Sequence, residues 1–134
     1  MNEGENCIFC KIVNNEIPST KVYEDGDFLA FVDIKPMLDG HLLLITKKHI
    51  VWMQDSEDEM IAQIFILTKK LMLAIKNGIG CDFVQVSVVG QEMPHFHIHL
   101  IPRYLNDGLP NFPFKDLDQE KTNKLVEKIK TNLF

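Results

Sequence analysis

The stretch that decides the fold of this chain is His95-Phe96-His97-Ile98-His99-Leu100-Ile101. Its histidines alternate with apolar residues, and alternation is the pattern of a half-buried β-strand, whose side chains point to opposite faces in turn. We therefore expect a strand with three imidazoles on one face, each about 7 Å from the next. Phe96, Ile98 and Leu100 are expected on the other face, in a core. A core gains nothing from a histidine row, because each ring has two nitrogens that need partners.

The histidine row has two functional interpretations, since imidazoles serve both as metal ligands and in catalysis. In the first, several imidazoles bind one ion. In the second, a carbonyl holds the Nδ1–H of one neutral ring, which leaves its Nε2 free to attack phosphorus. His97 and His99 have no carboxylate at ligand spacing in the sequence, and this favours catalysis by imidazole over a catalytic metal.

Outward from this row, short apolar runs separated by turn residues predict roughly five strands. We place them at 22–23, 28–32, 41–45, 83–89 and 96–101. A long central helix is expected to begin with a capping box of Ser56 and Glu59 and to end at Gly78. Residues 7–13 are expected as a short helix or turn, and 116–134 as a terminal amphipathic helix. This order predicts an α+β fold and not a doubly wound sheet.

Two groups of apolar residues leave the assembly open. The apolar face of the central helix is wider than one sheet needs, which indicates either a second subunit or a broad buried face. The residues that widen it are Ile66, Leu67 and Leu73. The last helix is expected to pack on the surface through Leu125, Ile129 and Leu133. Alternatively, it and the segment 111–114 cover a dimer edge or contribute to substrate choice.

The composition is that of one globular domain, which we place at 1–134. Of the 134 residues, 46% are hydrophobic, and the net charge of −5 argues against a basic surface that coats nucleic acid. No apolar run approaches the ~20 residues of a membrane-spanning helix. The polar start, Met1–Asn6, has no features of a secretory signal. Three cysteines argue against a disulfide framework, so we predict a cytoplasmic protein without membrane partners, in which Cys81 is a small buried residue.

Four segments carry a further pattern, at 7–12, 28–36, 40–50 and 90–103. Together they resemble the histidine triad (HIT) family, whose signature is His-φ-His-φ-His-φ-φ with φ apolar. The resemblance covers a core of about 7–103, leaves 104–134 as a C-terminal extension, and places all five histidines on family positions. It implies the HIT-like α+β fold, an antiparallel sheet with one long central helix, usually as a homodimer.

The resemblance also implies a function. Members cleave purine nucleoside phosphoramidates or related nucleotides at the α-phosphorus through a nucleotidyl-histidine. By residue, His97 is the implied nucleophile, His99 the hydrogen-bond donor to the phosphate, and His41 the support of the cluster. Asp33 is implied at the ribose hydroxyls and Gln91 at the phosphate. The implied base slot comprises Ile8, Phe9, Phe31 and Ile34.

Cys7 and Cys10 form a C-x-x-C pair, which alone is as typical of two small apolar residues as of metal ligands. Branches of the family that keep both cysteines bind a structural zinc with two cysteines and two histidines. The resemblance therefore implies a Zn²⁺ site of Cys7, Cys10, His49 and His95, in which His95 is a ligand and not a catalyst.

The sequence departs from the family pattern near the expected phosphate. Glu92 stands where many relatives carry Ser or Thr, whose hydroxyl assists the leaving group. The segment 86–89 is short and lacks the usual Asn- and Gly-containing loop, for which Ser87 is a candidate substitute. Two alternatives stay open beside a phosphoramidate hydrolase: a dinucleoside polyphosphate hydrolase, and a purine-nucleotide-binding module with weak catalysis that acts through partners.

Overall fold

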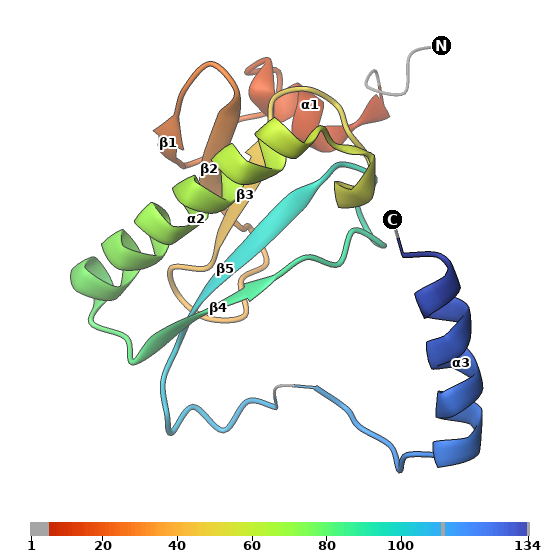
Figure 1. Ribbon diagram of the computed structural model, residues 1–134. Helices are drawn as coiled ribbons and strands as arrows, with labels where there is room; N and C mark the ends of the chain where they lie inside the picture. The colour runs from red at the N-terminus through yellow and green to blue at the C-terminus, as the bar shows by residue number, and fades with distance from the viewer. Residues whose placement is uncertain (1–5, 111, 134) are drawn as a thin grey trace.

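The fold is shown in Figure 1, a computed structural model that describes residues 6–110 and 112–133. Residues 1–5 of the polar start, residue 111 of the segment 111–114, and residue 134 lie outside these ranges. In chain order the elements are α1 (Ile8–Val13), β1 (Lys21–Glu24), β2 (Phe28–Val32), β3 (Leu42–Thr46), the 3₁₀ helix η2 (Met53–Asp55), α2 (Asp58–Ile79), β4 (Phe83–Ser87), β5 (His97–Arg103) and α3 (Gln119–Thr131). No helix within the described ranges is long and apolar enough to cross a membrane.

The five strands form one antiparallel sheet in the order β1-β2-β3-β5-β4. β3 is the middle strand and is buried along its whole length, because both faces of the sheet are covered there. β5 lies beside it, with His97 opposite Ile45 and His99 opposite Leu43. The predicted α+β fold, with its antiparallel sheet, long central helix and C-terminal helix, is confirmed.

Alternate residues of the central strands belong to two cores, one on each face of the sheet. Leu44 lies in the core that includes Ile64 of α2. Leu43, its neighbour, lies in the core that includes Phe9 of α1. The residues of the histidine stretch that were expected in a core all belong to the α2 side: Phe96, Ile98 and Leu100. The alternation predicted from the sequence therefore directs the β5 histidines to the α1 face.

The start of α2 differs from the expected capping box. Its N-cap is Glu57, whose side chain makes no capping hydrogen bond. Ser56 instead follows the 3₁₀ helix η2, and its hydroxyl is buried without a hydrogen-bond partner among the described residues. The capping-box prediction is therefore wrong, because the preceding 3₁₀ turn takes Ser56 out of the N-cap position.

The end of α2 lies two residues beyond the expected glycine. Gly80, at φ 80°, is the left-handed C-cap, and Gly78 lies inside the helix. The last helical residue, Ile79, packs closely on Gly40, where a Cβ atom would lie 2.4 Å from Ile79 Cδ1. This packing contact favours a last helical turn that continues past the first glycine.

α3 stands away from the sheet, at the end of an extended segment that leaves β5 (Figure 1). It buries no residue. The expectation that it packs on the surface is wrong, since Leu125, Ile129 and Leu133 are 46%, 61% and 55% exposed. In the segment before it, Phe112 and Phe114 are exposed as well. Nothing in the described part of the chain lies opposite this apolar face.

The wide apolar face of α2 is buried only in part. Leu67 belongs to the core, whereas Ile66 and Leu73 are more than half exposed. Cys81 is buried in the same core, as expected.

Candidate active site and metal centre

β5 carries His97 and His99 into a cavity on the α1 face of the sheet. The cavity has a volume of about 740 Å³. Apolar residues of α1 and β2 form much of its wall, and the polar groups come chiefly from the histidines and a few carboxyl and amide side chains. A mostly apolar cavity with a few convergent polar groups is typical of small-molecule sites.

Hydrogen bonds determine which ring nitrogen carries the proton in His41 and His99. The Met37 N–H donates to His41 Nδ1 at 3.0 Å, so the proton of the neutral ring is on Nε2. His41 Nε2–H then donates to His99 Nδ1 at 2.9 Å, which places the proton of neutral His99 on its Nε2. His99 therefore brings an N–H donor to the cavity that its ring lines.

His97 has the opposite polarity. Its Nδ1–H donates to the backbone carbonyl of His95 at 2.7 Å, so Nε2 keeps its lone pair. Phe9 and His99 hold the ring edge-on, with centroids 5.2 Å and 5.0 Å away. A fixed imidazole with a free Nε2 in a cavity is suited to act as a nucleophile or a general base.

Burial keeps the two supporting rings neutral. It lowers the pKa of His99 to about 4, and the nearby His97 and His41 rings act in the same direction. Burial also lowers the pKa of His41, which the Asp33 carboxylate partly opposes. The arrangement of protons, which requires neutral rings, therefore holds near pH 7.

Folding brings a carboxylate to the histidine row that the sequence spacing does not reveal. Asp33 Oδ2 lies 3.6 Å from His41 Nε2, and Asp33, His41 and His99 each place a ligand atom within 4.8 Å of the other two. Both nitrogens of His41 are already in hydrogen bonds, to the Met37 N–H and to His99. The group is therefore a hydrogen-bonded cluster. The sequence argument against a catalytic metal assumed that no carboxylate lies near His97 and His99, and this assumption does not hold in the folded chain.

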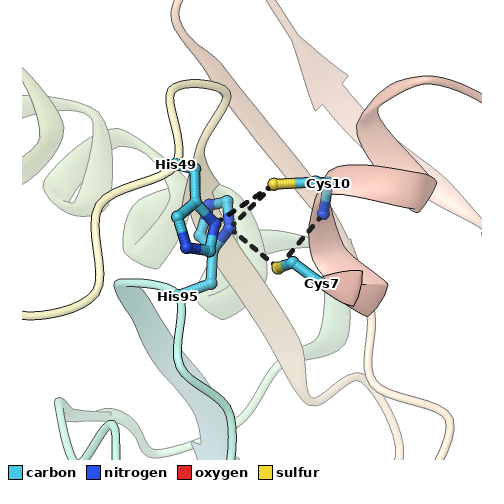
Figure 2. Close-up of side chains that lie close together, drawn as sticks. All are labelled: Cys7, Cys10, His49 and His95. Carbon is cyan, nitrogen blue, oxygen red and sulfur yellow. Dashed lines mark hydrogen bonds between the residues drawn. The ribbon is translucent and has the colours of Figure 1, made fainter. Parts of the chain in front are cut away.

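Four ligand atoms meet beside this cavity (Figure 2). Cys7 Sγ lies 3.3 Å from His95 Nδ1, and Cys10 Sγ lies 3.3 Å from His49 Nδ1. All four atoms lie within 4.8 Å of one another. His95 Nε2–H donates to the Thr46 carbonyl at 2.7 Å, which leaves Nδ1 with its lone pair toward the sulfurs. The four residues form a possible Cys₂His₂ metal site.

The charges of this cluster suit a cation. Burial lowers the pKa of His95 to about 4, so the ring is in the neutral form that binds metals. Burial, together with Cys7, raises the pKa of Cys10 to about 12. A metal ion at this site would therefore displace thiol protons.

The structure brings most of the expected nucleotide-site residues to one cavity. Its walls include Ile8, Phe9, Phe31, Asp33, Ile34, His41, His97 and His99. Gln91 is exposed and is absent from the described lining, whereas Glu92 is part of it. The turn at Gly90, at φ 81°, packs against the Trp52 ring, where a Cβ atom would lie 3.0 Å from Cζ3.

Three further polar residues line the cavity that the sequence analysis missed: Ser19, Lys35 and Gln85. The alternation of a β-strand could have predicted Gln85. Residues two apart share a face, and Ser87 of the same strand is on the cavity side. Lys35 follows β2 in an irregular turn, where no period applies.

Comparison with known proteins defines the class of this site. Residues 14–106 match the family described as HIT domain, and the chain belongs to this family. A HIT family protein of Bacillus subtilis has a crystal structure with a TM-score of 0.84 and 35% identity, covering 96% of this chain and 98% of that one. The resemblance stated from the sequence is thereby confirmed.

Two other relatives bear on chemistry and on the metal. An adenosine 5′-monophosphoramidase of Saccharomyces cerevisiae is 37% identical over 134 residues, which cover 95% of this chain and 82% of that protein. A zinc-bound histidine triad family protein of Mycobacterium smegmatis has a TM-score of 0.75 at 27% identity, and covers 97% of this chain and 99% of that one. The Cys7, Cys10, His49 and His95 cluster is consistent with the zinc-binding branch of the family.

Proposed function

We propose that the protein is a nucleotide hydrolase that cleaves purine nucleoside phosphoramidates at the α-phosphorus, with His97 as the nucleophile. The observation that carries the proposal is the polarity of the His97 ring, whose Nδ1–H is bound by the His95 carbonyl while Nε2 keeps its lone pair. Beside it, His99 Nε2 is a donor. A lone pair for phosphorus and a proton for a phosphate oxygen therefore lie next to each other. The similarity to the yeast monophosphoramidase supports the substrate class.

The proposed reaction has two steps. His97 Nε2 first forms a bond to the α-phosphorus as the P–N bond breaks, and the leaving amine takes a proton from water. The His99 Nε2–H stabilises the charge that develops on a phosphate oxygen. Water then attacks the same phosphorus, its proton passes to solvent, and the bond to Nε2 breaks. The nucleoside monophosphate leaves, and His97 regains its lone pair.

The base and ribose would occupy the α1 side of the cavity. Ile34 is 90% exposed and Ile8 47% exposed, so a purine stacked there removes apolar surface from water. Such burial contributes about 25 cal/mol per Å². Phe9 and Phe31, whose rings meet edge to face at 5.6 Å, close the slot. Asp33 ends this wall, and its carboxylate is available to the ribose hydroxyls.

The charges around the cavity favour a phosphoramidate over a dinucleoside polyphosphate. The side chains with formal charge in its described lining are Asp33, Glu92 and Lys35, while burial keeps His41 and His99 neutral. A phosphoramidate releases an amine, whereas a polyphosphate releases an anion. Because like charges repel at short range, Glu92 disfavours the anionic leaving group.

The proposed function is tested by release of AMP from adenosine 5′-phosphoramidate by the wild type and by His97→Ala. We expect turnover by the wild type and a loss of at least about 10³-fold in the variant, because the covalent step is removed. Acid-quenched wild type should carry an AMP adduct that the variant lacks. Equal rates would contradict the role of His97. AMP binding without turnover by the wild type would support the binding-module alternative.

The choice of leaving group is tested at Glu92. We expect Glu92→Gln to raise kcat/KM for diadenosine triphosphate about tenfold, which is 1.4 kcal/mol of relieved repulsion, and to change the phosphoramidate rate less. Glu92→Asp keeps the charge and is the matched control. Equal changes for both substrates, measured with and without added Mg²⁺, would show that the carboxylate does not select the leaving group.

We also propose that the metal is Zn²⁺ in a structural site. Tetrahedral geometry with ordinary zinc–sulfur and zinc–nitrogen bonds separates sulfur from nitrogen by about 3.6 Å. Here Cys10 Sγ lies 3.6 Å from His95 Nδ1, while the Cys7–His95 and Cys10–His49 separations are each 3.3 Å. With all four positions taken by protein ligands, the ion would bind no substrate. It would hold the start of α1 against the strand that carries His97.

We propose in addition that two copies associate through the apolar residues that the chain leaves exposed on α2, on α3 and in the segment between β5 and α3. These include Ile66, Leu73, Phe112, Phe114 and Ile129. A second copy is the simplest partner that covers all of them. A sedimenting mass that stays at 15.5 kDa would contradict the dimer.

A further inference from the structure

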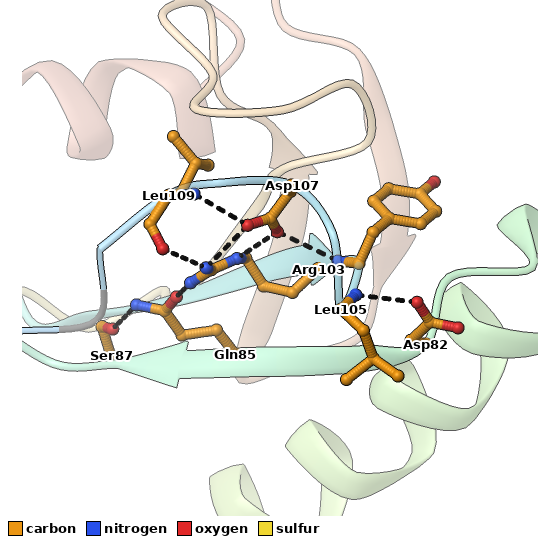
Figure 3. A network of polar contacts seen from close by, with 8 residues as sticks. Asp82, Gln85, Ser87, Arg103, Leu105, Asp107 and Leu109 are labelled. Carbon is orange, nitrogen blue, oxygen red and sulfur yellow. Dashed lines mark hydrogen bonds and ion pairs between the residues drawn. The ribbon is translucent and has the colours of Figure 1, made fainter.

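A buried arginine lies at the end of β5, on the face of the sheet that carries His97 and His99 (Figure 3). The Arg103 side chain is 3% exposed, and its Nε and Nη2 bind the two carboxylate oxygens of Asp107 at 2.6 Å and 3.0 Å. Nη2 also donates to the Leu109 carbonyl, and Nη1 donates to Gln85 Oε1. Asp107 in turn accepts the N–H groups of Tyr104 and Leu109. The loop after β5 thus holds the guanidinium in one orientation.

This guanidinium determines the orientation of the Gln85 amide. Arginine has no acceptor, so the amide oxygen of Gln85 faces Arg103 and the amide nitrogen faces away. The nitrogen donates to Ser87 Oγ at 3.1 Å. Since Ser87 Oγ accepts this proton, its own hydroxyl proton is directed to another acceptor. Donation therefore runs in one direction, from Arg103 through Gln85 to Ser87.

Ser87 lies where a phosphate would need a donor. It is directly opposite His99 across the β4–β5 pair, and both residues line the cavity. Side chains of directly opposite residues project from the same face with Cβ atoms about 4.5–5.5 Å apart. The Ser87 O–H and the His99 Nε2–H are consequently neighbouring donors on the cavity side of the sheet.

We propose that Ser87 donates its hydroxyl proton to an oxygen of the nucleotide 5′-phosphate, and that Arg103, Asp107 and Gln85 are positioning residues that direct this donor. The inference rests on the proposed function and deepens it, because it assigns the phosphate subsite to a pair of donors, Ser87 and His99. The buried ion pair at the end of β5 is then part of phosphate recognition, although neither Arg103 nor Asp107 is in the described cavity lining.

The first test compares the affinities of AMP and adenosine by calorimetry. Ser87→Ala should weaken AMP about 10- to 100-fold, because a hydrogen bond to a charged oxygen is lost, and should leave adenosine unchanged. Ser87→Thr keeps the hydroxyl and is the matched control. Equal weakening of both ligands, or unchanged AMP affinity, would overturn the assignment of Ser87. If the wild type bound neither ligand, the proposed nucleotide function itself would fail.

The second test addresses the direction of donation. Gln85→Glu keeps an acceptor for Arg103 but offers Ser87 a carboxylate, which accepts the hydroxyl proton. In this background Ser87→Ala should therefore change AMP affinity less than threefold, whereas it has its full effect in the wild-type background. This comparison cancels any direct effect of the added charge. An equal effect of Ser87→Ala in both backgrounds, at unchanged Tm, would overturn the positioning role of Gln85.

Discussion

The two histidine clusters of this protein lie next to each other and yet present opposite chemistry. In the metal cluster, the Thr46 carbonyl accepts a hydrogen bond from His95 Nε2–H, so Nδ1 faces the sulfurs. In the active-site cluster, the His95 carbonyl accepts a hydrogen bond from His97 Nδ1–H, so Nε2 faces the cavity. The same side chain becomes a metal ligand or a candidate nucleophile according to which nitrogen a backbone carbonyl occupies. Local backbone geometry, more than residue type, assigns the roles.

The clusters also share a residue. His95 contributes its Nδ1 to the metal cluster and its carbonyl to His97. The Phe9 ring packs edge-on against both histidines, with centroids 5.8 Å and 5.2 Å away. Loss of the metal cluster should therefore affect the active site by shifting the position of His97, and not by removing a group that takes part in the reaction.

The largest effect is expected from breaking the metal cluster. The double variant Cys7→Ser/Cys10→Ser should lose bound zinc and about 3 kcal/mol of unfolding free energy, or about 10 °C in Tm, because α1 is no longer tied to His49 and His95. Metal analysis and thermal unfolding measure the two quantities. At a temperature where the variant is folded, its activity should fall much less than that of His97→Ala. The reason is that His97 keeps its hydrogen bond to the His95 carbonyl.

A matched control for this variant is Cys81→Ser, which changes the cysteine that lies in the α2 core. It should keep the metal and lose stability only through core packing. If the cluster variant lost all activity while still folded, the metal would have a direct part in the reaction and the separation of roles would be wrong.

A smaller, purely catalytic effect is expected at His41. In His41→Ala the His99 ring loses the donor to its Nδ1. The ring proton is then free to move from Nε2 to Nδ1, so that Nε2 presents a lone pair, and not a donor, to the phosphate. We expect kcat to fall about 100-fold, as on loss of one oxyanion donor, with zinc content unchanged. His41→Gln retains an N–H donor near the same place and should recover part of the rate. Equal defects in the two variants would contradict the assigned proton positions.

The sequence was most informative where a period acts. The alternation at 95–101 predicted which face of β5 carries the histidines, since a strand has no other choice once Phe96, Ile98 and Leu100 are in a core. It was least informative where position depends on packing between distant segments. The approach of Asp33 to His41 depends on the turn after β2, and the end of α2 depends on the contact of Ile79 with Gly40.

Other parts of the interpretation stay predictions. The division into a core at 7–103 and an extension at 104–134 is one, and the roles of the individual site residues are others. The absence of Gln91 from the described cavity lining, beside a carboxylate at Glu92, shows why motif positions alone do not give a role. The turn at Gly90 decides which of these two side chains faces the cavity.

The smallest expected effect is on the pH dependence of the unfolding free energy. Burial lowers the pKa of His99 to about 4 from its ordinary 6.5, so between these values the unfolded chain binds the proton more tightly than the folded one. The stability that neutral His99 permits is therefore complete above pH 6.5 and is lost as the pH falls toward 4. The slope of the unfolding free energy against pH should stay below about 1.4 kcal/mol per pH unit, the limit for one group, because the ring lines an open cavity.

In His99→Asn, which keeps a donor and an acceptor but does not titrate, unfolding free energies measured with excess zinc should fall less steeply between pH 7 and 5. The excess ion holds His95 in the metal-bound form in both proteins, so that cluster contributes equally to both slopes. Identical slopes would mean that His99 has the same proton affinity in the folded and unfolded chain, which the partly buried His41–His99 hydrogen bond argues against.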